Sequence, residues 1–365
     1  MAQQAYEKLA HHLSSLGLGL PYRDDLLAIL RENLTPEEAE AAALLPTGVG
    51  PLEPVGIERL SAESGRPAAQ LSEVLERLAG RGLLFSGKTP EGTKGYALHQ
   101  VGFGFPQSFF WSGEHTDRAK RMTQLVMKYF SRDVTREAFG SAETKPYRYI
   151  PVEKSLSAEP QAVFSNHMME TVLERAQTFA LAHCPCRVQA DLLGRGCEHP
   201  LEVCLKFDDM AEYLIERGLG REVTRDEARE VVRKSAEAGL VHFVDNAAGA
   251  VKHNCNCCGC SCWNVGTIKR RKIPRDALMA TYFLRTTAED KCTGCGECVD
   301  VCPVDAVKMS DGLAVVDEEW CIGCGVCVPR CNFGAIELRP REDRGALPED
   351  FRELHRAILA EKGLV

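Results

Sequence analysis

A four-cysteine pattern that occurs twice near the C-terminal end constrains the fold of this 365-residue chain more than any other feature. The pattern is C-x2-C-x2-C-x3-C, formed first by Cys292, Cys295, Cys298 and Cys302 and then by Cys321, Cys324, Cys327 and Cys331. Each cysteine of the second copy lies 29 residues after its counterpart in the first, and the same offset places Ala335 and Ile336 opposite Ala306 and Val307. The segment is therefore an internal duplication, and its short spacings let neighbouring thiolates converge on a common metal group.

This spacing is typical of [4Fe–4S] clusters, in which three cysteines of one copy hold a cluster and the fourth cysteine reaches the cluster of the other copy. One cluster is therefore expected on Cys292, Cys295, Cys298 and Cys331, and the second on Cys321, Cys324, Cys327 and Cys302. Each fourth cysteine is expected at the start of a short helix. A structural zinc domain, the alternative, uses two separated pairs of ligands and not four cysteines in one run. Two [4Fe–4S] clusters move single electrons.

The residues around the repeat predict short strands at 281–285, 307–309, 313–316 and 335–339. This order of strands and cysteines resembles the two-cluster ferredoxins of bacteria over about sixty residues, and the resemblance implies a duplicated β-α-β fold at 278–342. Val304, Ile322 and Val326 are expected to shield the clusters from water. The second copy has Asn332 where the first has Pro303, which affects the local turn and not the ligands.

Nine further cysteines lie upstream of the repeat, in two groups. The first group is Cys184, Cys186, Cys197 and Cys204, and the second is Cys255, Cys257, Cys258, Cys260 and Cys262. The first group alone has enough thiolates for a cubane cluster, whereas the adjacent Cys257 and Cys258 cannot easily face one small cluster. We expect at least one additional metal centre here, with Fe–S favoured over zinc and over redox-active or unligated thiols.

The cysteine count also bears on the compartment of the protein. All 17 cysteines follow residue 183, the number is odd, and the N-terminus lacks a basic start followed by an apolar run. Reduced cysteines in a cytoplasmic, soluble protein are therefore expected in place of a disulfide framework. The CPCR and CNCCGCSC segments resemble those beside ferredoxin domains in uncharacterised Fe–S proteins of anaerobes, a resemblance that carries no known activity.

The first 105 residues predict helices at 24–33, 36–44, 57–64 and 67–81, followed by a hairpin. Thr35 is the expected N-cap before Pro36, and a turn is expected at Gly65. This order resembles a winged-helix domain, which often binds DNA. Residues 1–105, however, hold nine Lys or Arg against thirteen Asp or Glu, so the domain cannot neutralise phosphates. Protein docking or a structural role is therefore favoured over nucleic-acid binding.

The central segment 106–270 is expected to be a mainly helical, cysteine-rich domain, and 343–365 a helical tail. Helices are predicted at 115–130 and 162–182, and Thr224 with Glu227 forms a capping box that opens a helix ended by Gly239. His167, His183 and His199 lie near the cysteines but are not assigned as ligands. The predicted fold is thus multidomain α+β: a winged helix, a helical cysteine-rich domain and a ferredoxin-like domain.

The motifs point to electron transfer more than to complete catalysis. The chain has no dinucleotide-binding G-x-G-x-x-G after a strand, no P-loop and no nucleophile elbow. The net charge of −8 favours neither nucleic acid nor an anionic membrane, and no apolar run is long enough for a membrane span. We therefore expect a one-electron carrier or wiring subunit for a partner redox enzyme. The alternatives are an oxidoreductase with its active site at the central cysteines and a redox-sensing regulator.

Overall fold

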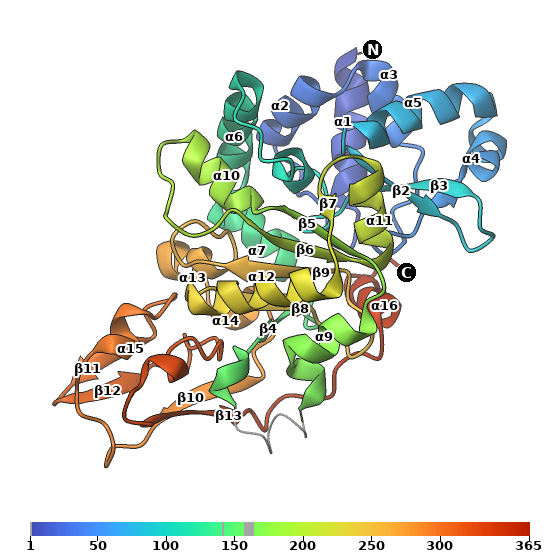
Figure 1. Ribbon diagram of the computed structural model, residues 1–365. Helices are drawn as coiled ribbons and strands as arrows, with labels where there is room; N and C mark the ends of the chain where they lie inside the picture. Colours follow the sequence, from blue (N-terminus) through green and yellow to red (C-terminus); the bar gives the residue numbers. More distant parts are fainter. Residues whose placement is uncertain (1, 141, 157–163) are drawn as a thin grey trace.

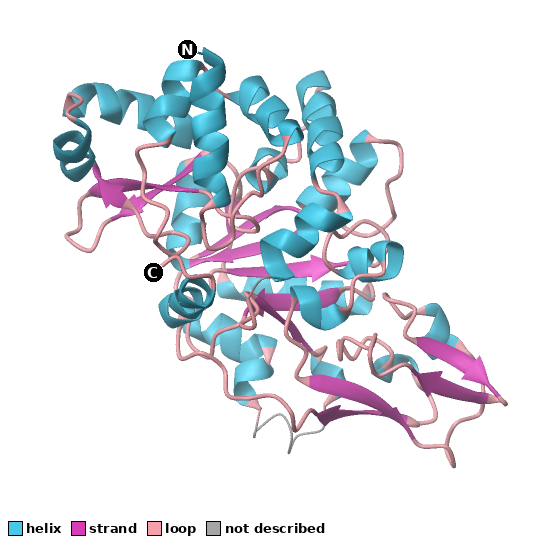
Figure 2. Ribbon diagram, turned by 180° about the vertical axis from the view of Figure 1, so that it is seen from behind, coloured by secondary structure: helices cyan, strands magenta, loops and turns pink. Residues whose placement is uncertain are grey.

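The computed structural model describes residues 2–140, 142–156 and 164–365, arranged in three tiers (Figures 1 and 2). Helices of the N-terminal part form one end of the molecule, a large sheet occupies the middle, and the strands around the cysteine repeat form the opposite end. The fold is therefore mixed α and β. None of the helices in these ranges is both long and apolar enough to cross a membrane.

The N-terminal tier contains five helices and a small sheet within the described residues. They are α1 (Ala2–Ser14), α2 (Asp24–Asn33), α3 (Pro36–Ala42), α4 (Ile57–Ser64), α5 (Ala68–Gly80), β1 (Val55–Gly56), β2 (Leu84–Lys88) and β3 (Lys94–Leu98). The strands form an antiparallel sheet in the order β1-β3-β2. Thr35 caps α3 in a capping box with Glu38, and Gly65 ends α4 with a φ of +68°. Helices α2 to α5 and the hairpin of β2 and β3 agree with the elements expected here, α1 and β1 were not expected, and the winged-helix resemblance stays a prediction.

Helix α5 contacts the central tier through Glu76. Arg217, whose side chain is 8% exposed, lies 2.6 Å from the carboxylate of Glu76 on α5 and also donates a hydrogen bond to Ser86. The hydrogen bond from Arg217 lowers the pKa of Glu76 to about 2. Tyr213 adds a hydrogen bond from its hydroxyl to the carbonyl of Leu84 on β2. These contacts make the N-terminal tier part of the protein's own packing.

The central tier is a six-stranded antiparallel sheet in the order β4-β8-β9-β6-β5-β7. Its strands are β4 (Tyr147–Ile150), β5 (Phe179–His183), β6 (Glu202–Phe207), β7 (Arg221–Glu222), β8 (Val241–Asp245) and β9 (His253–Cys257). The surrounding helices are η1 (Gln107–Phe110), α6 (Asp117–Tyr129), α7 (Arg132–Gly140), η2 (Glu153–Ser155), η3 (Ser165–His167), α9 (Met169–Arg175), α10 (Pro185–Leu192), α11 (Asp208–Glu216), α12 (Arg225–Glu237), α13 (Val265–Arg271) and α14 (Arg275–Leu278). The capping box of Thr224 and Glu227 is present at the start of α12.

The prediction of a mainly helical central domain was wrong. The helix expected at 162–182 is in fact α9 followed by strand β5, and its first two residues lie outside the described ranges. The error has a physical cause: β5 is buried on both faces, so its apolar residues do not alternate with polar ones. Leu181 packs on one side with α12, and Ala180 and Ala182 face the other side, where α11 lies.

The C-terminal tier holds two antiparallel pairs of strands, β10 with β13 and β11 with β12. Its elements are β10 (Phe283–Thr287), α15 (Glu297–Asp300), β11 (Val307–Ser310), β12 (Leu313–Val316), η4 (Val328–Arg330) and β13 (Ile336–Pro340). The chain then returns to the other tiers through α16 (Phe351–Glu361) (Figure 1).

The expected C-terminal tail is a helix, but it does not hang free. The ring of His355 packs against Phe103 with centroids 5.3 Å apart, and Lys362 donates hydrogen bonds to the carbonyls of Gly17 and Ala138. One buried apolar cluster runs from Ala5 through the central sheet to Ile358. The three tiers therefore share a continuous core, and the domain limits expected from the sequence stay predictions.

Candidate metal centres

The cysteines of the repeat line two separate cavities, each with three residues from one copy and one from the other. The outer quartet is Cys292, Cys295, Cys298 and Cys331. The inner quartet is Cys302, Cys321, Cys324 and Cys327. The structure thus groups the fourth cysteine of each copy with the first three of the other, which is the grouping that the spacing predicts.

Local backbone geometry repeats between the two quartets. Cys302 accepts a hydrogen bond from the amide of Ala306 at 3.2 Å, and Cys331 accepts the equivalent bond from Ala335 at 3.3 Å. Cys302 follows α15 and Cys331 follows η4, so the expectation that each would start a short helix was wrong. In the first copy the helical turn, Glu297–Asp300, includes the third cysteine, and in the second copy it is Val328–Arg330, so each turn ends just before the fourth cysteine.

The surroundings of the quartets suit a sulfur-rich, anionic group. Val304, Ile322 and Val326 are all buried, as expected for side chains that exclude water. Arg285 is 1% exposed, lines both cavities and donates a hydrogen bond from Nη2 to the sulfur of Cys298 at 3.4 Å. Its Nε and Nη1 are buried without a hydrogen-bond acceptor in the described part of the chain. Such donors are costly unless satisfied, and the sulfides of a cluster would satisfy them.

Comparison with known proteins agrees with this geometry. The family model of the 4Fe-4S binding domain matches residues 287–308 and 314–337. Residues 287–337 are a 4Fe–4S ferredoxin domain. Ferredoxin-1 of Nitratidesulfovibrio vulgaris is 62% identical over 29 residues, which are 8% of this chain and 47% of that protein. Ferredoxin-3 of Desulfocurvibacter africanus is 62% identical over 29 residues, 8% of this chain and 48% of that protein.

Ferredoxin-2 of Desulfomicrobium norvegicum is 64% identical over 25 residues, 7% of this chain and 42% of that protein. The match thus spans about half the length of these curated relatives, and no solved structure matches the chain. The ferredoxin domain carries [4Fe–4S] clusters and serves iron–sulfur electron transfer. The central tier is matched by none of these comparisons.

Six of the nine upstream cysteines line one buried cavity of about 80 Å³ in the central tier. This hexad consists of Cys184, Cys186, Cys204, Cys255, Cys257 and Cys262. The cavity, here called the cysteine chamber, is closed by aromatic side chains that include Trp111, Phe130 and Trp263. The two groups seen in the sequence are therefore mixed: three cysteines of each group enter the chamber.

Strand geometry explains how the hexad assembles. Cys255 and Cys257 are two residues apart on β9 and so project from the same face of the sheet, where Cys204 on the neighbouring β6 joins them. Cys184 and Cys186 come from the start of α10, and Cys262 from the loop before α13. Side-chain hydrogen bonds link the six in a row, in the order Cys184, Cys186, Cys262, Cys257, Cys255 and Cys204.

Two of these thiols are poised to lose their protons. Hydrogen bonds from Cys204 and Cys257 lower the pKa of Cys255 well below its usual range. The hydrogen bond from Cys186 is the main cause of the lowered pKa of Cys262. A thiolate is the form that binds metal, so the lowered pKa values of these two thiols favour the form that a metal would need.

Cationic side chains face the chamber, and its described lining contains no carboxylate. Lys206 is 2% exposed and has no ion-pair partner among the described residues; its ammonium lies 4.8 Å from the ring centroid of Trp111. Burial alone would lower the pKa of His253, but Asp245, 3.0 Å away, outweighs burial and raises it to about 9. Arg187 is buried beside Cys184 and Cys257.

A metal–thiolate group suits the hexad if its negative charge balances the positive charge of these buried side chains. Removing an unpaired ammonium from water costs several kcal/mol, even after the protein relaxes. A cluster held by thiolates is anionic and would supply the missing counter-charge for Lys206. Nothing in the sequence pointed to Lys206 or Arg187, whereas His253 could have been found, because it lies two residues before Cys255 on the same strand.

The remaining three upstream cysteines lie together outside the chamber. The trio is Cys197, Cys258 and Cys260, whose sulfur atoms all lie within 4.8 Å of one another. Cys258 and Cys260 line a surface groove together with Cys302 of the inner quartet. His199 also lines this groove, whereas His167 and His183 line neither the groove nor the chamber.

Proposed function

We propose that this protein is an iron–sulfur electron-transfer protein that serves as a one-electron carrier or wiring subunit for a partner redox enzyme. The outer and inner quartets each bind a [4Fe–4S] cluster, and the hexad binds a further Fe–S centre. Electrons move one at a time between the partner, the outer cluster, the inner cluster and the central centre. The order of these sites in the fold supports the proposal.

One contact carries the proposal: the loop between Cys258 and Cys260 packs directly against the inner quartet. A Cβ atom on Gly259 would lie 2.2 Å from the carbonyl oxygen of Pro303, the residue after Cys302. No side chain fits between the two backbones, so the central cysteine loop and the inner cluster are neighbours. Short separations of this kind favour electron exchange between metal centres.

Further contacts fix the inner quartet onto the central tier. The amide of Val152 donates to the carbonyl of Cys324 at 2.9 Å, and Arg275 donates to the carbonyl of Cys321 at 2.6 Å. Lys269 forms an ion pair of 2.8 Å with Asp305. The inner quartet is thereby held in one position relative to the hexad, which an electron path requires.

The outer quartet is the more exposed of the two quartets. Cys295 is exposed, and Phe333, 53% exposed, lines the same cavity. Met309 and Val315, on the neighbouring hairpin, are 40% and 49% exposed. Apart from Val365, these are the large apolar side chains that stay exposed in the described ranges, and such patches mark interaction sites. A redox partner that docks here would meet the outer cluster first.

Replacing Gly259 with alanine should slow electron exchange between the ferredoxin clusters and the central centre. The added methyl group forces the loop and Pro303 apart, and a displacement of this kind costs on the order of 1–3 kcal/mol in a packed region. The clusters would be photoreduced anaerobically, and freeze-quenched EPR samples would follow the appearance of spin on the central centre. Iron content should equal that of the wild type.

Gly345 provides the control, because a Cβ atom there meets no neighbour within 4 Å. Gly345→Ala should leave the exchange rate unchanged. Equal rates in wild type and Gly259→Ala would show that electrons do not pass through this contact, and the proposed wiring would be wrong.

The regulator alternative is tested by DNA binding of the whole protein. The surface of residues 1–105 has a net acidic composition, and α5 is partly covered by Arg217. The protein should not retard duplex DNA at physiological salt, in either oxidation state. A salt-dependent, sequence-selective retardation measured in a gel-shift assay would instead support a regulator.

A second candidate function is an oxidoreductase that acts at the central cysteines. One observation favours it: the groove beside the trio opens to solvent, and Cys302 of the inner quartet also lines it. Substrate-dependent turnover by the isolated chain would support this candidate over the carrier.

A further inference from the structure

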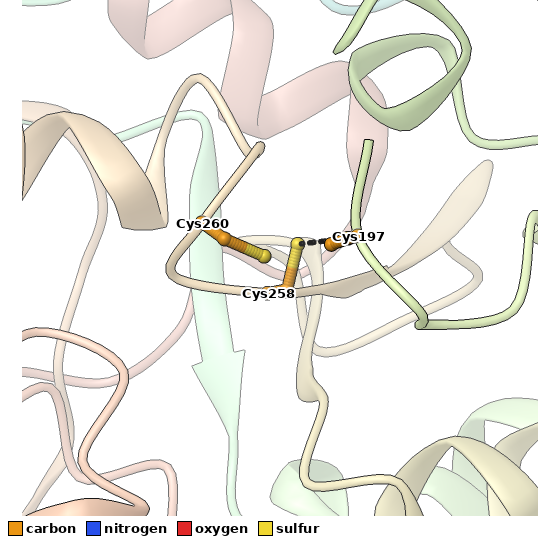
Figure 3. Close-up of side chains that lie close together, drawn as sticks. All are labelled: Cys197, Cys258 and Cys260. Atoms are coloured by element: carbon orange, nitrogen blue, oxygen red, sulfur yellow. Dashed lines mark hydrogen bonds between the residues drawn. The ribbon is translucent and has the colours of Figure 1, made fainter. Parts of the chain in front are cut away.

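The trio is built differently from every other set of ligands in the structure. Cys197 comes from the loop between α10 and β6, and Cys258 and Cys260 from the loop after β9, and their side chains converge (Figure 3). The sulfur atoms of Cys197 and Cys258 are 4.0 Å apart. Among the described residues, no other three histidine, cysteine or acidic side chains come within 4.8 Å of one another.

This spacing distinguishes a single ion from a cluster. Tetrahedral zinc has Zn–S bonds of about 2.3 Å, which places neighbouring sulfur ligands about 3.8 Å apart. In a cubane each cysteine binds its own iron, so its thiolates stand further apart, and no three sulfur atoms of either quartet lie within 4.8 Å of one another. The trio therefore converges on a point close to where one tetrahedral ion would sit, and the quartets do not.

We propose that Cys197, Cys258 and Cys260 bind a single zinc ion whose fourth coordination position faces the groove and accepts an exchangeable ligand. Thiolates are preferred zinc ligands, and three protein ligands with one open position are typical of zinc sites that act on a bound molecule. This inference concerns a site separate from the hexad and does not depend on an Fe–S centre there.

The supporting contacts hold the sulfurs in place without filling the fourth position. The amide of Ser261 donates a hydrogen bond to Cys258 at 3.4 Å, and the hydroxyl of Ser261 lies 3.6 Å from the sulfur of Cys197. Arg270 donates to the carbonyls of Gly259, Cys260 and Cys262, which fixes the loop. Within the described ranges no fourth histidine, cysteine or acidic side chain joins the three sulfurs within 4.8 Å, and Cys260 is exposed.

The groove indicates the class of ligand. Its lining includes Lys269, Arg270 and Arg330, together with His199, against the single carboxylate of Asp300 among the described residues. Lys269 is partly neutralised by Asp305, which leaves an excess of positive charge. A small anion, such as a thiolate or a carboxylate, would therefore be attracted to the open position. Because Cys302 also lines the groove, that anion would be held close to the inner quartet.

X-ray absorption at the zinc edge of full-length protein, purified anaerobically without added thiols, tests the proposal. We expect about one zinc per chain, bound by three sulfur atoms and one lighter atom. Addition of 2-mercaptoethanol should change the shell to four sulfurs, because the thiolate replaces the exchangeable ligand. Four sulfurs before the addition, or a shell that does not respond, would show a closed site and contradict the inference.

Two variants assign the ion to the trio. Cys260→Ala should remove the zinc and leave iron and sulfide unchanged, and because Cys260 is exposed the change should not disturb folding. Cys255→Ala, in the hexad, is the matched control and should retain the zinc. Loss of iron and sulfide from Cys260→Ala would overturn the inference, because the trio would then belong to a cluster. That outcome would not affect the proposed electron path, which the Gly259→Ala experiment tests separately.

Discussion

Replacing Cys186 and Cys262 together with alanine is expected to remove all the iron that the chain carries beyond its two ferredoxin clusters. The two residues are hydrogen-bonded to each other in the row of six sulfurs, so the double change divides the hexad. Wild-type protein should carry clearly more than the iron of two cubanes, with roughly four irons and four sulfides for each additional cubane. The double variant should return to the amount expected for the ferredoxin domain, measured by iron and acid-labile sulfide assays.

A control variant separates this effect from general damage to the central tier. Cys258 is as buried as the hexad cysteines and is adjacent to Cys257, but it faces the trio. Cys258→Ala should therefore retain the excess iron. The EPR signal of the reduced ferredoxin clusters should be the same in all three proteins. If wild-type protein carries no excess iron and no metal in the hexad, these cysteines are redox-active thiols, and the oxidoreductase alternative gains support.

The ferredoxin part could be predicted from the sequence because its information is local. Three cysteines within seven residues must face one another whatever the rest of the chain does, and the 29-residue offset shows the duplication directly. The strands β10 to β13 fall within two residues of their expected positions, since each borders a turn or a cysteine loop. The grouping of the cysteines into quartets thus follows from local spacings that can be recognised in the sequence.

The central cysteines could not be divided correctly from the sequence because their grouping depends on the sheet. Cys197 and Cys204 are close in sequence, but Cys204 lies on β6 and faces the chamber while Cys197 precedes the strand and joins the trio. Cys257 and Cys258 are adjacent yet enter different sites, as expected for neighbouring residues at the end of a strand. Because β5 is buried, its sequence pattern did not predict a strand, and the sheet was missed. Without the sheet, the division of the cysteines between the chamber and the trio cannot be inferred.

The role of the charged residue in the chamber also depends on the sheet and could not be predicted from the sequence. Lys206 lies on β6 among apolar neighbours, a position where a strand pattern alone suggests a solvent-facing lysine. Only the fold shows that its ammonium turns toward the hexad and has no carboxylate partner in the described part of the chain. Buried charge of this kind is costly, so it identifies the chamber as a site and not as packing.

The crossed arrangement of the two ferredoxin clusters predicts different iron losses for two double variants. Cys302→Ala with Cys321→Ala changes two residues of the inner quartet, so one cluster should be lost and about four irons with it. Cys302→Ala with Cys292→Ala changes one residue in each quartet, so both clusters should be damaged and up to about eight irons lost.

Each pair contains Cys302→Ala, so the two variants are controls for each other. The measurement is iron per chain after anaerobic purification, compared with wild type, together with the EPR signal of dithionite-reduced protein. The variant that keeps one ferredoxin cluster should lose the spin coupling between the two clusters but retain the signal of the outer one. If each fourth cysteine instead served its own copy of the motif, Cys302 and Cys292 would belong to one cluster and the two iron losses would be exchanged. That reversal would show that the four cysteines lining each cavity are not the ligands of one cluster.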